Sequence, residues 1–457
     1  MDETQDSTVL SKATEILERH VICDRCLGRQ FGWLSTETSN ENRGQSIKLV
    51  LSMIADDLIK SGQKDEGIRI LQVLAENGMY SPAQTLIERN SLNYEEQTAC
   101  HFCAIAGKSI FDAIPLLCNG AQFNLSKIEF STFLVGSVPA PMLVEHEDEI
   151  RAELGLLHGE TFKADFNREL GKCLEERLDQ SVDFEAPDVV VVYDMCSAKL
   201  EIRINPIFIS GRYRKLKRGI PQSRWDCRKC RGKGCENCNQ TGRMYPDSIA
   251  EYIGEPVKEA FQGTRFKFHG AGREDIDVLM LGSGRPFAVE VAKPRLRNID
   301  LNKLAKRINK GAKKKVEVFD LEVSTRSNSQ KLKEGASSNI KEYEAIIQTE
   351  NDVTEGTLRE TSTKLSGASI QQRTPHRVSH RRSDLVREKH IFEVKLRMRK
   401  DGLIEGFFKV QGGTYIKELV SGDEGRTTPS ISELLGTSCK CKELNVTAIY
   451  NETYHNP

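Results

Sequence analysis

The stretch FHGAGREDIDVLMLGSGRPFAVEV, residues 268–291, places four charged side chains between a glycine-rich turn and a run of alternating apolar residues. They are Arg273, Glu274, Asp275 and Asp277. The alternation predicts a half-buried strand, and burying a carboxylate costs free energy unless a cation and hydrogen bonds support it. Arg273 stands two residues before Asp275, so both project from one face of an extended segment. The pattern indicates either a structural ion pair or an ionised carboxylate that acts as a nucleophile.

The composition is that of a globular protein with balanced charge. The 457 residues are 38% hydrophobic and 29% charged, with 66 Lys and Arg against 66 Asp and Glu. Basic residues nevertheless gather at 203–243 and 293–315. Such clusters are typical of polyanion-binding proteins, and solvated surface is the alternative. Because no apolar run approaches a membrane span and no signal-peptide core is visible, we expect a cytoplasmic protein without membrane association.

The hydrophobic periodicity predicts an α+β protein. Residues 11–88 space their apolar side chains as helices do, and the segments from 123 onward mix strands with helices. We expect an N-terminal accessory domain at 1–215, a basic linker with a cysteine-rich knuckle at 216–245, and a C-terminal domain at 246–457.

The C-terminal domain carries short segments that alternate apolar and polar residues. They predict a mixed, mainly antiparallel sheet with Asp275 in a loop at the edge of a cleft. Outside these strands, residues 123–137 are predicted as a strand and 211–225 as a linker or exposed loop. The polar stretch 349–372 is predicted as loop or short exposed helix. The four strand segments are 286–293, 343–348, 391–399 and 403–410.

A cysteine-rich island, WDCRKCRGKGCENCNQTGR at 225–243, contains Cys227, Cys230, Cys235 and Cys238. Two CxxC pairs at this spacing can hold one zinc ion with four thiolates. The segment has too few apolar residues to form a core, so a metal would have to fold it. Free or disulfide-linked thiols are the alternative. We predict a structural zinc site whose intervening basic residues contact phosphates.

Two further CxxC pairs, Cys23 with Cys26 and Cys100 with Cys103, lie far apart in the chain. A redox role lacks a thioredoxin-like βαβ context, and unrelated thiols remain an alternative. We predict that the two pairs share a second structural zinc, which clips the N-terminal helices to the module that follows.

Motifs for nucleotide or metal-assisted hydrolysis are missing from the sequence. There is no GxxxxGK[ST], and Gly282-Ser-Gly284 is not followed by the third glycine of a dinucleotide-binding loop. Neither G-x-S-x-G nor HExxH occurs. The expected chemistry therefore uses no organic cofactor and rests on carboxylate, Arg, Lys or Tyr side chains.

Three stretches in a fixed order resemble the active-site motifs of pseudouridine synthases. They are GREDIDV (272–278), KEYEAIIQ (341–348) and GGTYIKELV (412–420). Together with QRTPHRVSHRR (372–382) and the cysteine island, they resemble one branch, the archaeal tRNA pseudouridine synthases of the TΨC loop. The resemblance is strong over 220–457 and looser over the N-terminal half.

The resemblance implies a role for particular side chains. Asp275 corresponds to the nucleophile, Tyr343 to the aromatic ring that stacks on the uracil, and Lys417 to the cation paired with the nucleophile. One departure is Leu279, where the family commonly has an arginine that contacts RNA or a carboxylate. Further substrate contacts are implied for Tyr343, Tyr415, Arg273 and Arg381.

The resemblance also implies a substrate and a domain content. It implies a THUMP-like region at about 75–205, tRNA as the partner, no organic cofactor and no obligatory protein partner. The implied reaction converts uridine to pseudouridine in the TΨC loop, at positions fifty-four and fifty-five. The alternative is a non-catalytic THUMP and zinc protein that binds or chaperones tRNA. A THUMP-type methyltransferase or thiolation enzyme would need a glycine-rich cofactor loop or P-loop, which the sequence lacks.

Overall fold

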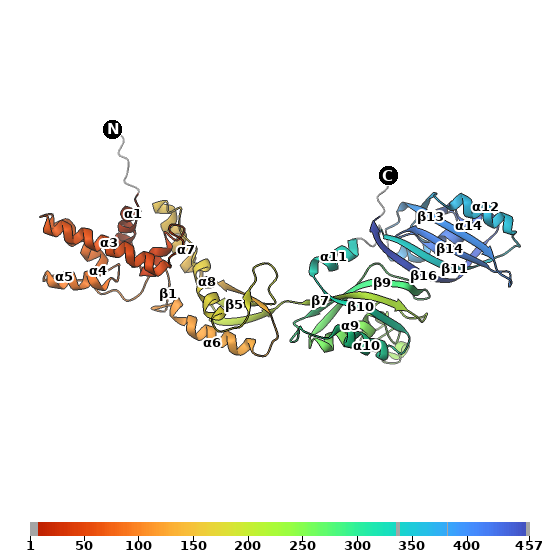
Figure 1. The fold of residues 1–457 in the computed structure, drawn as a ribbon, viewed down its shortest axis with the longest axis horizontal. Helices are drawn as coiled ribbons and strands as arrows, with labels where there is room; N and C mark the ends of the chain where they lie inside the picture. Colours follow the sequence, from red (N-terminus) through yellow and green to blue (C-terminus); the bar gives the residue numbers. More distant parts are fainter. Residues whose placement is uncertain (1–7, 335–338, 382, 454–457) are drawn as a thin grey trace, which may run out of the picture. The chain divides into compact units, whose positions relative to one another are not determined.

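The computed structural model describes residues 8–334, 339–381 and 383–453 (Figure 1). The chain divides into two compact units, Met1–Asn205 and Pro206–Pro457, and each has its own hydrophobic core. The division falls before the boundary that the sequence suggested after residue 215, because β7 (Ile207–Lys215) pairs with strands of the second unit. None of the described helices has the length and hydrophobicity that crossing a membrane requires.

The first unit begins with packed helices, as the periodicity predicted. Two glycines let α2 and α3 approach closely: a Cβ on Gly44 would lie 1.9 Å from the carbonyl oxygen of Asp24, and one on Gly28 would lie 1.8 Å from that of Asn40. The buried Lys48 on α3 donates to the Asp24 carboxylate at 2.7 Å. These helices are α1 (Val9–Arg19), α2 (Asp24–Arg29), α3 (Asn40–Lys60), α4 (Lys64–Ala75) and α5 (Ser81–Arg89).

The rest of the first unit contains a two-stranded sheet of β1 and β2 and a four-stranded sheet with the order β4-β3-β5-β6, against which α6 and α8 pack. The β3 pairs are parallel and β5 pairs antiparallel with β6. The elements are β1 (Ala104–Ile105), β2 (Lys108–Ser109), η1 (Ile110–Ala113), α6 (Ile114–Leu125), β3 (Thr132–Val138), α7 (Pro141–Leu154), α8 (Phe162–Glu175), β4 (Ser181–Val182), β5 (Val189–Asp194) and β6 (Lys199–Ile204).

The second unit is built on one ten-stranded sheet with the order β10-β7-β9-β16-β11-β14-β13-β12-β15, and β8 also pairs with β9. In the described part of this sheet, β9 with β16 is the one parallel pair, so the sheet is mixed and mainly antiparallel, as expected. The strands are β7 (Ile207–Lys215), β8 (Arg265–Gly270), β9 (Leu279–Ala292), β10 (Val316–Ser324), β11 (Asn339–Thr349), β12 (Ser369–Arg373), β13 (Val386–Met398), β14 (Ile404–Gln411), β15 (Thr427–Thr428) and β16 (Cys439–Thr453).

The parallel contact joins the two halves of this sheet and is short. Leu279 and Met280 of β9 pair with Asn445 and Val446 of β16. Gly282 follows with a φ of +49°, and a Cβ there would lie 1.9 Å from a β16 carbonyl oxygen. Glycine is required at this position because it tolerates both the left-handed backbone and the close approach. The loop that carries Asp275 ends where this contact begins.

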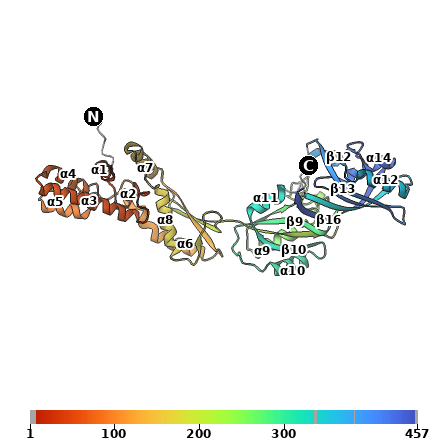
Figure 2. The ribbon, with the colours of Figure 1, turned by 45° about the horizontal axis from the view of Figure 1, so that its top comes forward.

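Helices cover each half of the sheet. α9 and α10 pack on β8, β9 and β10 in one half, and α12 and α13 pack on β13 and β16 in the other (Figure 2). The helices and 3-10 turns of this unit are η2 (Glu236–Cys238), α9 (Ile249–Ala260), α10 (Leu301–Gly311), α11 (Arg326–Glu334), α12 (Glu355–Leu365), η4 (His376–Arg381), α13 (Ile416–Ser421) and α14 (Ile431–Leu435).

Three local predictions differ from the structure. The predicted strand at 123–137 begins with the end of α6, and the strand itself starts at Thr132. The predicted linker at 211–225 begins inside β7, where Tyr213 and Lys215 are buried by tertiary packing. The polar stretch after 349 contains α12, which is more than an exposed helix because Leu358 and Leu365 are fully buried.

We predict that Gly44→Ala destabilises the first unit by about 1–3 kcal/mol, because the added methyl group meets rigid backbone. Hydrogen exchange of the α2 and α3 amides should report the change. Gly120→Ala in α6 is the control, since its Cβ would lie 3.6 Å from Leu200 in ordinary contact. Equal exchange rates in the two variants would contradict the close approach of α2 and α3.

Candidate active site and metal centres

A cavity of about 350 Å³ in the second unit brings the three sequence motifs together. Asp275 enters it from the loop between β8 and β9, Tyr343 from β11, and Lys417 from α13. Tyr415 and Arg273 also line it. The remaining wall includes side chains from the junction of β9 with β16, so the cavity lies at the joint between the halves of the sheet. Three predicted catalytic residues that are far apart in the sequence therefore share one cavity.

An ion cluster surrounds the Asp275 carboxylate. Arg377 Nη1 lies 2.8 Å from Asp275 Oδ2, and Lys417 Nζ lies 3.6 Å from the same oxygen. Lys417 makes its shorter contact, 2.7 Å, with Asp277 Oδ2. Arg377 Nε also donates to the buried carboxylate of Glu418 at 2.6 Å. Two cations thus form ion pairs with three carboxylates beside the cavity.

The carboxylates in this cluster differ in exposure. The Asp275 side chain is 32% exposed and that of Asp277 is 68% exposed. Burial opposes ionisation of Asp277, but the hydrogen bonds and charge of Lys417 lower its pKa below the usual value. Asp275 therefore remains reachable by a substrate while two cations neutralise its charge.

The loop that carries Asp275 is held by its backbone. The buried amine of Lys215, on β7, donates to the carbonyl oxygens of Asp275 at 3.1 Å and Ile276 at 2.7 Å. Burial lowers the pKa of Lys215 to about 8. Arg218 donates to the carbonyl oxygen of Asp277 at 2.6 Å. These donors fix the loop without occupying the carboxylates.

A buried polar network lies behind the same loop. Glu274, 6% exposed, forms an ion pair with Arg285, with 2.7 Å between Glu274 Oε2 and Arg285 Nε, and accepts a hydrogen bond from the hydroxyl of Tyr213 at 3.0 Å. Gln222 donates to the Tyr213 hydroxyl at 3.0 Å and to the carbonyl oxygen of Gly272 at 2.9 Å. Glu274 therefore stabilises the fold next to Asp275, the candidate nucleophile. This structural role accounts for one of the four charged residues at 273–277.

Two tyrosines provide aromatic surface in the cavity. Burial raises the pKa of Tyr343 to about 12, so its hydroxyl stays protonated at neutral pH. The backbone of Tyr415 is clamped by the buried Gln372, whose amide donates to the Tyr415 carbonyl oxygen at 2.9 Å and accepts from its N–H at 2.8 Å. The Arg377 guanidinium lies 5.9 Å from the centre of the Tyr415 ring.

The cation closest to Asp275 was not predicted. Sequence reasoning placed Arg273 beside the carboxylate and chose Arg381 from the segment QRTPHRVSHRR. The structure gives the shortest ion pair to Arg377 in that segment, whereas the side chain of Arg381 lies outside the described residues. The sequence motif indicated this segment, but the sequence alone does not show which of its basic side chains contacts Asp275.

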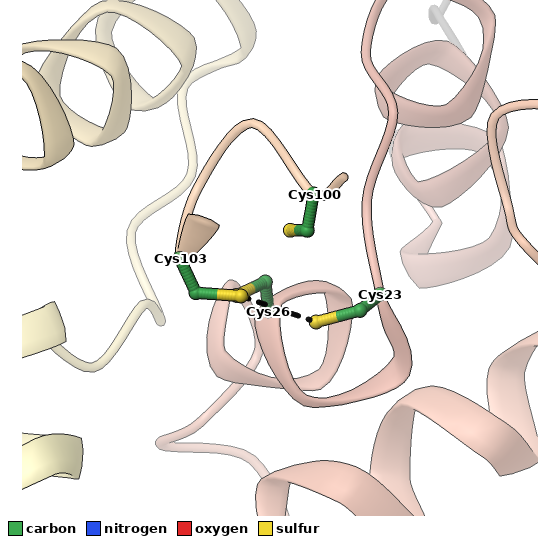
Figure 3. Close-up of side chains that lie close together, drawn as sticks. All are labelled: Cys23, Cys26, Cys100 and Cys103. Atoms are coloured by element: carbon green, nitrogen blue, oxygen red, sulfur yellow. Dashed lines mark hydrogen bonds between the residues drawn. The ribbon is translucent and has the colours of Figure 1, made fainter. Parts of the chain in front are cut away.

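The four N-terminal cysteines meet as predicted. Cys23 and Cys26 lie at the start of α2, and Cys100 and Cys103 lie on the loop before β1 (Figure 3). Their sulfur atoms lie within 4.8 Å of one another. The fully buried Arg29 donates to Cys26 Sγ at 3.4 Å and pairs with Glu147 of α7 at 2.9 Å. The cysteine group is thereby tied to the helices of the sheet module.

The second cysteine group lies in the second unit, between β7 and α9. Cys227, Cys230, Cys235 and Cys238 also place their sulfur atoms within 4.8 Å of one another. Backbone N–H groups at 234 and 242 each donate to a sulfur at 3.2 Å. Such donors stabilise thiolates, which supports metal binding by this group.

The sulfur spacing tests whether these groups fit a metal ion. Neighbouring sulfurs are 3.8 Å apart in the pairs Cys23–Cys103, Cys227–Cys235 and Cys230–Cys238. A disulfide would need about 2.05 Å. A tetrahedron with metal–sulfur bonds of about 2.3 Å has edges of about 3.8 Å. Both groups therefore have the dimensions of a tetrathiolate metal site.

Family models match both units of the chain. The model described as "Pus10, C-terminal" matches residues 208–450, more than half of the chain, and "Pus10 THUMP domain, archaeal" matches 119–194. The chain belongs to the Pus10 family of tRNA pseudouridine synthases. The resemblance drawn from the sequence motifs is confirmed, and the THUMP match lies inside the predicted range of about 75–205.

Relatives in the Pus10 family align over nearly the whole chain. The tRNA pseudouridine synthase Pus10 of Methanocaldococcus jannaschii is 41% identical and covers 96% of this chain and 94% of its own. That of Halorubrum lacusprofundi is 34% identical and covers 97% of each. A chain in the crystal structure of a Cbf5-Nop10-Gar1 complex is 18% identical over 42% of this chain and 43% of its own, with a TM-score of 0.26, too low to support an argument.

We predict that Arg285→Met destabilises the second unit by about 3–5 kcal/mol, because it leaves the buried Glu274 carboxylate without its cation. The double variant Glu274→Gln with Arg285→Met should recover part of this loss, since no unpaired charge remains. Denaturant unfolding of the wild type, each single variant and the double variant measures the coupling. Simple additivity of the two substitutions would contradict the buried pair.

Proposed function

We propose that this chain converts uridine to pseudouridine in the TΨC loop of tRNA, at positions fifty-four and fifty-five, with Asp275 as the nucleophile. The observation that carries the proposal is the meeting of Asp275, Tyr343 and Lys417 in one cavity of the second unit. Family membership supplies the reaction class. The motif resemblance supplies the loop and the two positions.

The reaction is an isomerisation and requires no oxidant or reductant. The target nucleotide leaves the base stack, which costs a few kcal/mol, and Asp275 attacks it. The N1–C1′ bond breaks, the uracil turns, a C5–C1′ bond forms, the bond between the nucleotide and Asp275 breaks again, and a proton passes from C5 to N1. Tyr343 supplies the face on which the base stacks, and Arg377 and Lys417 hold the Asp275 carboxylate in ion pairs. No step in this sequence calls for an organic cofactor.

Contact with tRNA is assigned to the THUMP region and to basic surfaces. α10 buries Leu304 and Ile308, so its basic residues project outward. Binding through such a surface releases counterions from the phosphate backbone. The exposed bases of α10 and the turn after it are Lys303, Lys306, Arg307, Lys310, Lys313 and Lys314. A non-catalytic tRNA binder would use these surfaces equally well, but it has no need for an ion cluster around a reachable carboxylate.

The metal in both cysteine groups is proposed to be zinc with a structural role. Zinc prefers tetrahedral thiolate sets, and four protein ligands leave no open position for chemistry. Residues 23–26 would then be joined to 100–103, and residues 227–238 would be folded around the second ion. Metal-bound thiolates require reduced cysteines, which fits a cytoplasmic location.

We predict that Asp275→Asn abolishes pseudouridine formation while the fold and tRNA affinity remain, because size is kept and the nucleophilic charge is lost. Carbodiimide mapping of an unmodified tRNA transcript measures the product. Asp277→Asn is the matched control and should retain far more activity, since Asp277 only shares Lys417. Tyr343→Phe should lose less activity than Tyr343→Ala, which removes the stacking ring. Full activity of Asp275→Asn would refute the mechanism.

Purified protein should contain two zinc ions per chain by elemental analysis. Cys227→Ser should lose one ion and loosen the segment around it, whereas Cys196→Ser, at an exposed thiol outside both groups, should keep both. Full reactivity of the eight paired thiols in the native protein would show that neither group holds a metal.

A further inference from the structure

Lys341 is a buried amine on the wall of the cavity that contains Asp275. Its side chain lines the cavity, the residue is 6% exposed, and no described residue forms a hydrogen bond or ion pair with its amine. Other buried lysines of the same unit are satisfied. Lys215 donates to two backbone carbonyls, and Lys389 donates to the carbonyl oxygen of Gly412 at 2.9 Å.

An amine in this position is costly for the fold. Taking a polar or charged group out of water without a partner is unfavourable, and an apolar side chain of similar length would avoid the cost. Packing therefore gives no reason for lysine here. A ligand that fills the cavity and brings a hydrogen-bond acceptor would supply the missing partner.

The charged groups around Lys341 come from three elements. Burial lowers the pKa of Lys341 to about 7, and the charges of Arg285 and Lys389 act in the same direction. Glu274 acts in the opposite direction, but its carboxylate is bound to Arg285. Near neutral pH the amine thus changes between a charged and a neutral donor.

Lys341 and Tyr343 lie two residues apart on β11, so their side chains share one face of the sheet. Their Cα atoms are separated by about 7 Å along an extended strand. A base that stacks on Tyr343 therefore brings its edge toward Lys341. The two residues together define where a planar ligand lies in the cavity.

We propose that Lys341 contacts the substrate by donating a hydrogen bond to a carbonyl oxygen of the uracil that stacks on Tyr343. The inference rests on the proposed function and names a contact within the same site. Uracil offers O2 and O4 as acceptors. A phosphate fits this position less well, because it would bring a strongly hydrated charge to the inner wall of the cavity.

The first test separates function from folding. Lys341→Met should raise the melting temperature, because it removes an unpartnered buried amine, while it lowers kcat/KM about 10- to 100-fold, as expected for a lost hydrogen bond to a charged donor. The gain in stability should be larger at pH 6 than at pH 9, since the buried charge that destabilises the fold is lost as pH rises through about 7. Lys389→Met should gain less, because it removes an amine that already donates a hydrogen bond to the carbonyl oxygen of Gly412.

The activity difference should also depend on pH. The charged amine is the stronger donor, so the wild-type advantage in kcat/KM over Lys341→Met should shrink as pH rises through about 7. A merely structural role for Lys341 predicts a constant ratio. A constant ratio, or a melting temperature that falls with activity, would overturn the proposal.

The second test identifies the acceptor with tRNA that carries 2-thiouridine or 4-thiouridine at a target position. Sulfur accepts hydrogen bonds weakly, so the wild type should lose rate on one of these substrates and Lys341→Met should lose little more. Equal losses of rate in the wild type and in Lys341→Met would show that Lys341 does not contact the base carbonyls. A contact between Lys341 and a phosphate would give this result. Inactivity of the wild type on ordinary tRNA would instead refute the proposed function itself.

Discussion

The ion pairs of the Asp275 carboxylate in the wall of the cavity set the requirements for the rest of the second unit. Asp275 pairs with Arg377 and Lys417, which come from η4 and α13. Neither cation is near Asp275 in sequence, so the sheet must bring three segments together. The surrounding carboxylates Asp277 and Glu418 then orient those cations. The cluster is therefore a small network of ion pairs whose geometry depends on the complete domain.

The joint between β9 and β16 explains why the cavity occurs where it does. Among the described strands, one short parallel pairing links the two halves of the sheet, and the Asp275 loop enters it directly. Antiparallel hairpins on either side need no such joint, because their strands pair continuously. The backbone donors Lys215 and Arg218 hold this loop from the β7 side. The two halves of the sheet thus contribute different parts of one site.

The sequence identified the three motifs whose residues line one cavity, but it did not identify Arg377, which contacts Asp275. Asp275, Tyr343 and Lys417 were assigned by resemblance, and they line one cavity. The group at 227–238 followed from ligand spacing, which is a local property, whereas the pairs at 23–26 and 100–103 had to be joined across a long stretch of chain. Arg377 was missed because its role depends on contact with a loop far along the chain. Sequence periodicity likewise misjudged β7, since burial of Lys215 follows from tertiary hydrogen bonds and not from its hydrophobicity.

The N-terminal cysteine group has a consequence for the tolerance of the chain to change in length. Residues 26 and 100 are brought together, so α3, α4, α5 and the polar stretch after them form one closed loop. The entropic cost of closing a loop grows only with the logarithm of its length. Insertions or deletions between α5 and Cys100 would therefore alter the closure cost little and leave the four sulfurs in place. This part of the chain can vary in length without disturbing the cysteine cluster.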